Sequence, residues 1–194
     1  MLFKSDDTSI ITPGQKALVN DSTESACGFV YNESFAQLSQ AIGELSNNQI
    51  KYLISDGNWS AIHVLRYLLD YCGPAEVFIS SWSISEDSVR SLQQLLISGH
   101  LTKVNAIFDN RVKIFTPSIA HYANHNFQCA YGQCHAKITA VIGEKMSAVV
   151  IGSANYNNNR RLEAGVLSSH EKDVLYFRDY ILLKISEWNC PKNN

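Results

Sequence analysis

Short apolar segments alternate with longer amphipathic ones along most of this chain, and this alternation restricts the fold more than any other feature. Residues 50–55 (IKYLIS), 76–80 (EVFIS) and 103–108 (KVNAIF) are short apolar runs typical of buried strands. Residues 60–72 and 85–98 lie between them and carry apolar side chains at helical spacing. Strands joined through helices make right-handed crossovers, so the sequence predicts an α/β fold with a largely parallel sheet.

The remaining segments complete this architecture. Residues 33–45 and 171–188 have the pattern of helices, residues 134–155 read as a hairpin, and residues 163–169 as a further strand. The hairpin adds antiparallel pairing, so we expect a mixed, largely parallel β-sheet flanked by helices on both faces. Polar residues punctuated by Pro and Gly predict a flexible tail over 1–24, which leaves 25–194 as a single domain.

Composition narrows the class of protein. A chain of 194 residues that is 45% hydrophobic can bury roughly 70% of its unfolded surface in one core. The formal charge of -2 gives no global positive field, so any nucleic-acid contact must be made by a local basic patch. The sequence has no signal-peptide pattern and no apolar run that predicts a membrane span. Five cysteines without a repeating spacing indicate free thiols, and we expect a cytoplasmic protein.

The hairpin over 134–155 (CHAKITAVIGEKMSAVVIGSAN) has its polar side chains concentrated at one end. Residues two apart on a strand share a face, so His135 and Lys137 point the same way, as do Ser153 and Asn155. A turn at the middle of the segment places the two pairs opposite each other, where opposed beta carbons are about 5 Å apart. We therefore expect one small polar pocket at the open end of the hairpin.

This pocket would combine an imidazole, a fixed cation, a hydroxyl and an amide. Such a set can hold and attack a phosphoryl group, whose charge spreads over several oxygens. Gly152 would let the backbone approach the ligand closely. The alternative is a buried polar end whose groups are satisfied by backbone hydrogen bonds.

The two polar pairs read HAK at 135–137 and GSAN at 152–155, and the sequence continues as YNNNRRLEAGVL. These residues resemble the signature of the phospholipase D superfamily, which is His-x-Lys, an Asp five residues after the Lys, and then Gly-Ser-x-Asn. The resemblance covers the order of elements from about 45 to 190. It has one departure, because Ile142 occupies the position of the Asp, and nearby Glu144 in the turn either substitutes for it or does not.

The resemblance implies a phospholipase D-like half-domain fold and a two-step cleavage of a phosphodiester without metal or cofactor. A histidine attacks phosphorus to form a phosphohistidine, and a second histidine protonates the leaving oxygen and then activates water. His135 would be the nucleophile or the acid/base, while Lys137, Ser153 and Asn155 would bind phosphate oxygens. Glu163 would accept a hydrogen bond from the imidazole, or else is a surface carboxylate.

The substrate is less tightly predicted. The resemblance to compact single-motif endonucleases favours a nuclease, in which Arg160 and Arg161 contact flanking phosphates or lie on a solvated turn. Tyr156, Tyr122 and Trp59 either stack on bases or pack in the core. A phospholipase or phosphatidyl-transfer enzyme would need an apolar acyl groove, and the missing aspartate leaves open a catalytically silent phosphate or nucleic-acid binding module.

A second constellation lies just upstream of the hairpin. His121, His125, Cys129 and Cys134 could form a tetrahedral zinc site, although their spacing fits none of the common zinc fingers. The segment is more naturally a loop over the active site. We therefore expect no bound metal.

The implied chemistry needs two histidines, two lysines and two asparagines around one phosphate, but the paired motif occurs once. We therefore expect a homodimer in which two hairpin ends meet across a two-fold axis. Such an interface should include apolar residues near the site.

Overall fold

The computed structural model describes residues 19–22, 25–32, 35–57, 59–157 and 161–190. The strands are β1 Val19–Ser22, β2 Ser25–Asn32, β3 Ile50–Asp56, β4 Ala75–Ser81, β5 Leu101–Asp109, β6 Gln128–Gly132, β7 Ile138–Gly143, β8 Ser147–Gly152 and β9 Leu162–Ser168. The helices are α1 Phe35–Ile42, α2 Ala61–Cys72, α3 Glu86–Ile97, α4 Asn110–Phe115, α5 Pro117–Asn126 and α6 Glu171–Asn189. Among the described residues, no helix is both long enough and apolar enough to cross a membrane.

The strands form one mixed sheet in the order β1-β2-β3-β9-β8-β7-β4-β5-β6. The pairings show that β2, β3, β8, β4, β5 and β6 run in one direction, while β1, β7 and β9 run in the other. Helices α2 and α3 connect parallel strands, as the alternating sequence pattern predicts. Three neighbouring pairs of the described strands are parallel and five are antiparallel, so the sheet is mixed and partly parallel. It is less parallel than the sequence predicts, because β9 and β7 run antiparallel to both of their neighbours in the middle of the sheet.

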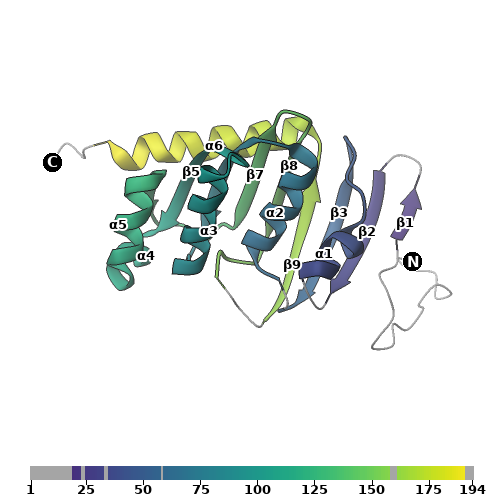
Figure 1. Cartoon of the computed structure of the whole chain (residues 1–194), viewed down its shortest axis with the longest axis horizontal. Coiled ribbons are helices and arrows are strands. Elements are labelled where there is room, and N and C mark those ends of the chain that lie inside the picture. Colours follow the sequence, from purple (N-terminus) through teal and green to yellow (C-terminus); the bar gives the residue numbers. More distant parts are fainter. Residues whose placement is uncertain (1–18, 23–24, 33–34, 58, 158–160, 191–194) are drawn as a thin grey trace, which may run out of the picture.

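Helices cover both faces of this sheet, which confirms the predicted fold class. Side chains alternate across β4, so that Val77 and Ile79 join the core under α1, α2, α3 and α5, while Phe78 joins the core under α6. Figure 1 shows α2 and α3 in front of the central strands and α6 running across the sheet along its top.

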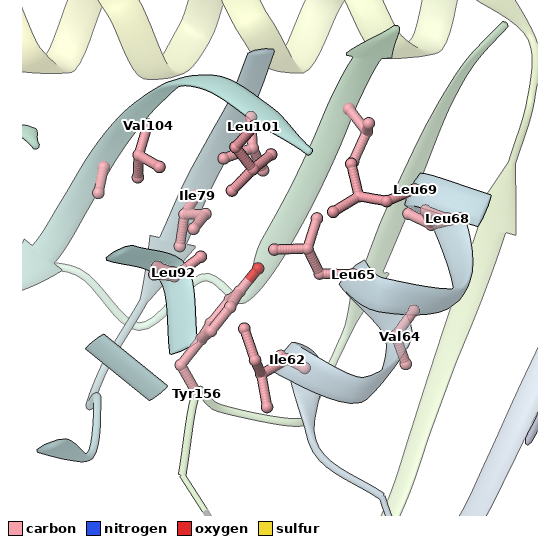
Figure 2. Close-up of a cluster of buried hydrophobic side chains, with 14 of the residues drawn as sticks. Ile62, Val64, Leu65, Leu68, Leu69, Ile79, Leu92, Leu101, Val104 and Tyr156 are labelled. Atoms are coloured by element: carbon pink, nitrogen blue, oxygen red, sulfur yellow. The ribbon is translucent and has the colours of Figure 1, made fainter. Parts of the chain in front are cut away.

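The core under α2 anchors the segment that follows β8. Leu65 and Leu68 are completely buried, and each contributes about 2 kcal/mol of stability through removal of apolar surface from water. Tyr156 lies among these apolar side chains (Figure 2), and its hydroxyl group is 2.7 Å from Thr139 Oγ1 on β7. This buried tyrosine fixes the chain one residue after the polar Gly-Ser-x-Asn sequence.

Several elements differ from the sequence prediction. The segment containing His121 and His125 was expected to be a loop over the active site, but it forms α5. Pro117 occupies the first turn of this helix, and Ala120 and Ala123 are buried against the core. Of the expected tail over 1–24, the structure describes residues 19–22, which form β1, and the other tail residues lie outside the described part of the chain.

Candidate active site

The polar ends of β7 and β8 lie side by side at one end of the sheet. Ile138 pairs with Ile151, and the backbone N–H of Gly152 donates to the carbonyl oxygen of Lys137 at 3.1 Å. The backbone hydrogen bonding between the two strands therefore extends to Lys137, the residue before the start of β7. Because β4, β5 and β8 run in the same direction, their carboxyl ends meet at this end, where ligands bind in open α/β sheets.

A cleft of ≈ 880 Å³ opens at this end. It brings together seven of the side chains or backbone positions singled out in the sequence, namely His135, Lys137, Gly152, Ser153, Asn155, Arg161 and Glu163. Arg160 lies outside the described residues. Trp82 after β4 and the aromatic residues of α6, Tyr176, Phe177 and Tyr180, also line the cleft.

The His135 ring is exposed in the cleft and lies next to Lys137. Lys137 Nζ is 3.3 Å from His135 Nδ1 and donates to the His135 carbonyl oxygen at 2.7 Å. A charged ammonium group can only donate hydrogen bonds. In this arrangement Nδ1 is therefore the acceptor, and a neutral ring carries its proton on Nε2.

Lys137 is half-buried, and this lowers the pKa of its ammonium group from the ordinary value of 10.5. The nearby groups Cys134 and Glu163 act in the opposite direction and raise the pKa. Burial is the larger effect. The cleft therefore contains a partly desolvated cation that a phosphate oxygen could contact.

Ser153 and Glu163 connect β8 to β9. The Ser153 hydroxyl group donates to the Glu163 carboxylate and accepts from the backbone N–H of Ala164 at 3.0 Å. Glu163 is only 6% exposed, so this carboxylate is part of the cleft wall and does not lie on the open surface. Its expected hydrogen bond to the imidazole remains a prediction.

Asn155 is 8% exposed and is held by the end of β4. Its Oδ1 lies 3.3 Å from Ser81 Oγ, which donates to the carbonyl oxygen of Ser83 at 2.7 Å and lies 3.4 Å from the backbone N–H of Tyr156. Ser81 thus contacts the amide of Asn155 beside the cleft. The sequence analysis missed this residue, although it directly follows a predicted strand, where functional side chains of parallel sheets gather.

The close packing of β8 against β9 requires glycine at position 152. A beta carbon at this position would lie 2.7 Å from the carbonyl oxygen of Ala164 and 3.1 Å from Cα of Gly165. The glycine therefore allows β8 and β9 to approach closely. Close packing of the two strands therefore explains this glycine. The close approach of a ligand, which the sequence suggested, is not needed to explain it.

An apolar rim surrounds one side of the cleft. It consists of Ile151, Leu162, Tyr176 and Tyr180, which are all exposed. Leu162 is 68% exposed and Tyr176 is 66% exposed, and a group of exposed apolar side chains of this size is more informative than any one of them. The rim joins the β8–β9 end to α6, two elements that the sequence analysis did not connect.

The alternative zinc ligands do not come together. His121 and His125 are exposed on α5, whereas Cys134 is buried with its Sγ 3.1 Å from Ser80 Oγ. Burial raises the pKa of Cys129 to about 12, which disfavours the thiolate that zinc binds. Within the described part of the chain, no three His, Cys, Asp or Glu side chains are grouped to hold a metal ion.

The residue that replaces the motif aspartate lies away from the cleft. Ile142 is four residues along β7 from Ile138, which is about 13 Å on an extended strand. It packs against the core under α6. Glu144 is exposed in the turn at the same far end. Neither residue lines the cleft.

The aromatic residues proposed to stack on bases have other surroundings. Tyr156 and Trp59 are buried in the core, and Tyr122 packs beneath Arg90, whose guanidinium carbon is 5.6 Å from the ring centroid. Trp82 is the aromatic residue nearest to the imidazole, with ring centroids 5.9 Å apart, and it was not singled out in the sequence.

Comparison with known proteins gives no match to a protein-family model and none to a curated protein sequence. Solved structures do match. The phospholipase D family member Nuc from Salmonella typhimurium superposes with a TM-score of 0.51 and 16% identity, over 71% of this chain and 93% of Nuc. The chain has a phospholipase D-like fold.

Two further structures are similar. Polyphosphate kinase from Porphyromonas gingivalis matches with a TM-score of 0.53 and 12% identity, over 75% of this chain but only 27% of the kinase. NucT from Helicobacter pylori matches with a TM-score of 0.48 and 17% identity, over 71% of this chain and 96% of NucT. At these identities the Nuc and polyphosphate kinase matches, whose TM-scores exceed 0.5, establish the fold alone, and the chemistry must be argued from the cleft.

Proposed function

We propose that this protein is a phosphodiesterase, most specifically a metal-independent nuclease that acts through a phosphohistidine at a site shared by two copies of the chain. The observation that carries the proposal is the convergence of His135, Lys137, Ser153, Asn155 and Glu163 in one cleft. These side chains supply a nucleophile, a cation, a hydroxyl group, an amide and a carboxylate. Together they suit an anionic phosphodiester whose charge must be held while phosphorus is attacked.

The reaction needs two imidazoles. In the first step, one imidazole nitrogen forms a bond to phosphorus, the bond from phosphorus to the leaving oxygen breaks, and the second imidazole gives that oxygen a proton. In the second step, the second imidazole takes a proton from water, the water oxygen attacks phosphorus, and the phosphorus–nitrogen bond breaks. The product is a phosphomonoester, and both imidazoles return to their starting states.

Lys137 has two roles in this scheme. While its ammonium group donates to Nδ1, the His135 ring is neutral with its proton on Nε2, so Nε2 has no free lone pair with which to attack phosphorus. When phosphate oxygens enter the cleft, they compete for the ammonium group as acceptors of greater charge. His135 Nδ1 is then free to hold the proton, and Nε2 can act as the nucleophile.

The second imidazole would come from another copy of the protein. The apolar rim of Ile151, Leu162, Tyr176 and Tyr180 lies beside the cleft and would be covered in a two-fold dimer. An isologous contact places each rim against its counterpart and each cleft beside the other. The rim thus provides the apolar residues expected near a shared site.

Nucleic acid is the substrate that we favour. Arg161 lines the cleft and can contact a phosphate that flanks the scissile one. Cys72, Cys129, Cys134 and Cys190 are free thiols, which supports a nuclease of the cytoplasm. The same apolar rim would also fit an acyl chain, so a phosphatidyl substrate is the second candidate.

An activity panel tests the proposal. Single-stranded DNA, RNA, phosphatidylcholine vesicles and bis(4-nitrophenyl) phosphate are each incubated with the protein in EDTA, and the solution mass is measured by light scattering. We expect nucleic-acid cleavage that survives EDTA, is abolished by His135→Ala, and comes with a dimer mass. Turnover of the vesicles alone would select the phosphatidyl substrate, while absence of all turnover would indicate a binding module. A strictly monomeric, fully active protein would contradict the shared site.

A further inference from the structure

Trp82 places an aromatic ring directly beside the catalytic imidazole. It follows the last residue of β4 and lines the same cleft as His135 and Lys137. The centroids of the Trp82 and His135 rings are 5.9 Å apart and their planes are tilted by 59°. The indole is half-buried, so part of its surface remains open to a ligand in the cleft.

Arg111 adds a positive charge to the same ring. It is the second residue of α4, and its guanidinium carbon lies 5.1 Å from the Trp82 ring centroid. The Arg111 side chain remains 60% exposed. Trp82 and Arg111 therefore offer a flat apolar surface next to an accessible cation, which we name the Trp82 shelf.

Hydrogen bonds hold the parts of the shelf in place. Asp109 Oδ1 accepts from the backbone N–H of Arg111 at 3.0 Å, and Asp109 Oδ2 accepts from the backbone N–H of Cys134 at 3.0 Å. Ser80 Oγ donates to the carbonyl oxygen of Ala136 at 3.0 Å. These bonds tie together the three segments that carry the tryptophan, the arginine and the histidine, so the shelf exists before a ligand binds.

We propose that the Trp82 shelf binds a nucleobase of the nucleotide next to the scissile phosphate, and that it makes the protein select single strands. This inference rests on the proposed nucleic-acid substrate. A base lies one sugar away from its phosphate, which suits a ring that directly neighbours the attacking imidazole. Aromatic side chains stack on bases of any sequence, and arginine adds a cation–π contact and attracts the backbone.

The chemistry of the shelf favours a base over a lipid headgroup. A choline group also binds aromatic rings, but it carries a positive charge, which Arg111 would repel. A base in a duplex is already stacked between its neighbours, so it reaches the shelf only after unstacking. A base in a single strand pays little of this cost, and preference for single strands follows.

Binding measured without cleavage tests this directly. In a His135→Asn background, fluorescence anisotropy reports the Kd of a labelled single strand, of the same strand with abasic sites, and of its duplex. We expect the base-containing strand to bind at least about tenfold more tightly than the abasic strand. Trp82→Ala should remove this difference, and Trp82→Phe should keep most of it because a ring remains.

Arg90 provides the matched control for Arg111. Both are exposed arginines over an aromatic ring and both pair with a carboxylate, Arg111 with Asp109 and Arg90 with Glu86. Arg90 covers Tyr122, and neither Arg90 nor Tyr122 lines the cleft. Arg111→Gln should weaken single-strand binding severalfold, and Arg90→Gln should leave it unchanged. Equal binding of base-containing and abasic strands, or a Trp82→Ala effect that is equal on both, would overturn the shelf.

The outcomes also separate the shelf from the proposed function. Base-dependent binding that Trp82→Ala removes, in a protein that cleaves no phosphodiester, would support the shelf and overturn the nuclease. Cleavage of nucleic acid with base-independent binding would do the reverse. A loss of affinity for phosphatidylcholine vesicles in Trp82→Ala, with unchanged strand binding, would overturn the shelf in favour of a headgroup site.

Discussion

The two ends of the β7–β8 hairpin belong to the same strands, but one end gathers polar side chains and the other is closely packed. At the open end, Lys137 and Ser153 meet hydrogen-bond partners in a cleft, and the neighbouring strands supply Ser81 and Glu163. At the turn end, Gly143 packs against the C-terminus of α2, and a beta carbon there would lie 2.3 Å from the carbonyl oxygen of Cys72. The open end carries the polar groups that the proposed chemistry needs, and the turn end is packed against α2.

This difference shows how a regular strand pair can gather polar side chains at one end. The apolar residues between the ends are buried on both faces and set the register. The register then decides which polar residues meet, because a slip of one residue would move every side chain to the other face. Stability and chemistry are therefore separated along the strands, and substitutions at the two ends should have different consequences.

The largest contrast is expected between two lysines. Lys137→Met removes the cation of the cleft and should lower kcat/KM by about 100-fold or more, since one lost charge contact in such a site costs about 3 kcal/mol. Lys145→Met at the turn should change the rate less than about twofold, because Lys145 is exposed there. Steady-state kinetics on one nucleic-acid substrate measures both. Equal rates for the two variants would remove Lys137 from the site.

Two glycines sharpen the comparison. Gly152→Ala would crowd the carbonyl oxygen of Ala164, and Gly143→Ala would crowd that of Cys72. Both should lower the free energy of unfolding by about 1 to 3 kcal/mol through overpacking. Only Gly152→Ala should also lower kcat of the folded protein, by about tenfold, because it shifts Ser153 against β9. Denaturant unfolding and kinetics on the same samples would separate the two effects, and a normal kcat in Gly152→Ala would contradict this account.

The pH dependence of activity should report the burial of Lys137. Burial lowers its pKa below the ordinary 10.5, so the protonated form needed for phosphate binding is lost as pH rises through that lowered value. The alkaline limb of kcat/KM should therefore lie below pH 10.5. Lys137→Arg should move the limb upward, because guanidinium stays charged. Between the lowered pKa and 10.5, Lys137 is protonated more fully in the unfolded chain than in the folded one, so the free energy of unfolding rises with pH in this range. An alkaline limb that is unchanged in Lys137→Arg would assign it to another group.

The smallest effect on the reaction is expected at Ile142. Ile142→Asp restores the residue of the related signature, yet it places a carboxylate against the core under α6. We expect a loss of about 1 to 3 kcal/mol in stability and a rate within about twofold of the parent protein. Thermal unfolding and kinetics check this pair of outcomes. A large gain in rate would mean that the far end of the hairpin communicates with the cleft.

The sequence predicted the parts of the molecule that depend on local patterns. Alternation of strands and helices gave the sheet and its covered faces, and a period of two grouped His135 with Lys137. It could not reveal Trp82 or Tyr176, because these residues reach the cleft from the end of β4 and from α6, and their positions depend on the packing of distant segments. It also missed α5, whose ten residues have a weak helical pattern and are held by tertiary contacts.

Trapping the covalent intermediate would test the central claim most directly. The protein is mixed in EDTA with a radiolabelled phosphodiester, quenched in alkali because phosphohistidine is labile in acid, and mapped by peptide mass. The account predicts label on His135 and none in His135→Ala. Rapid cleavage with no labelled histidine, or cleavage that EDTA abolishes and a divalent metal restores, would contradict it.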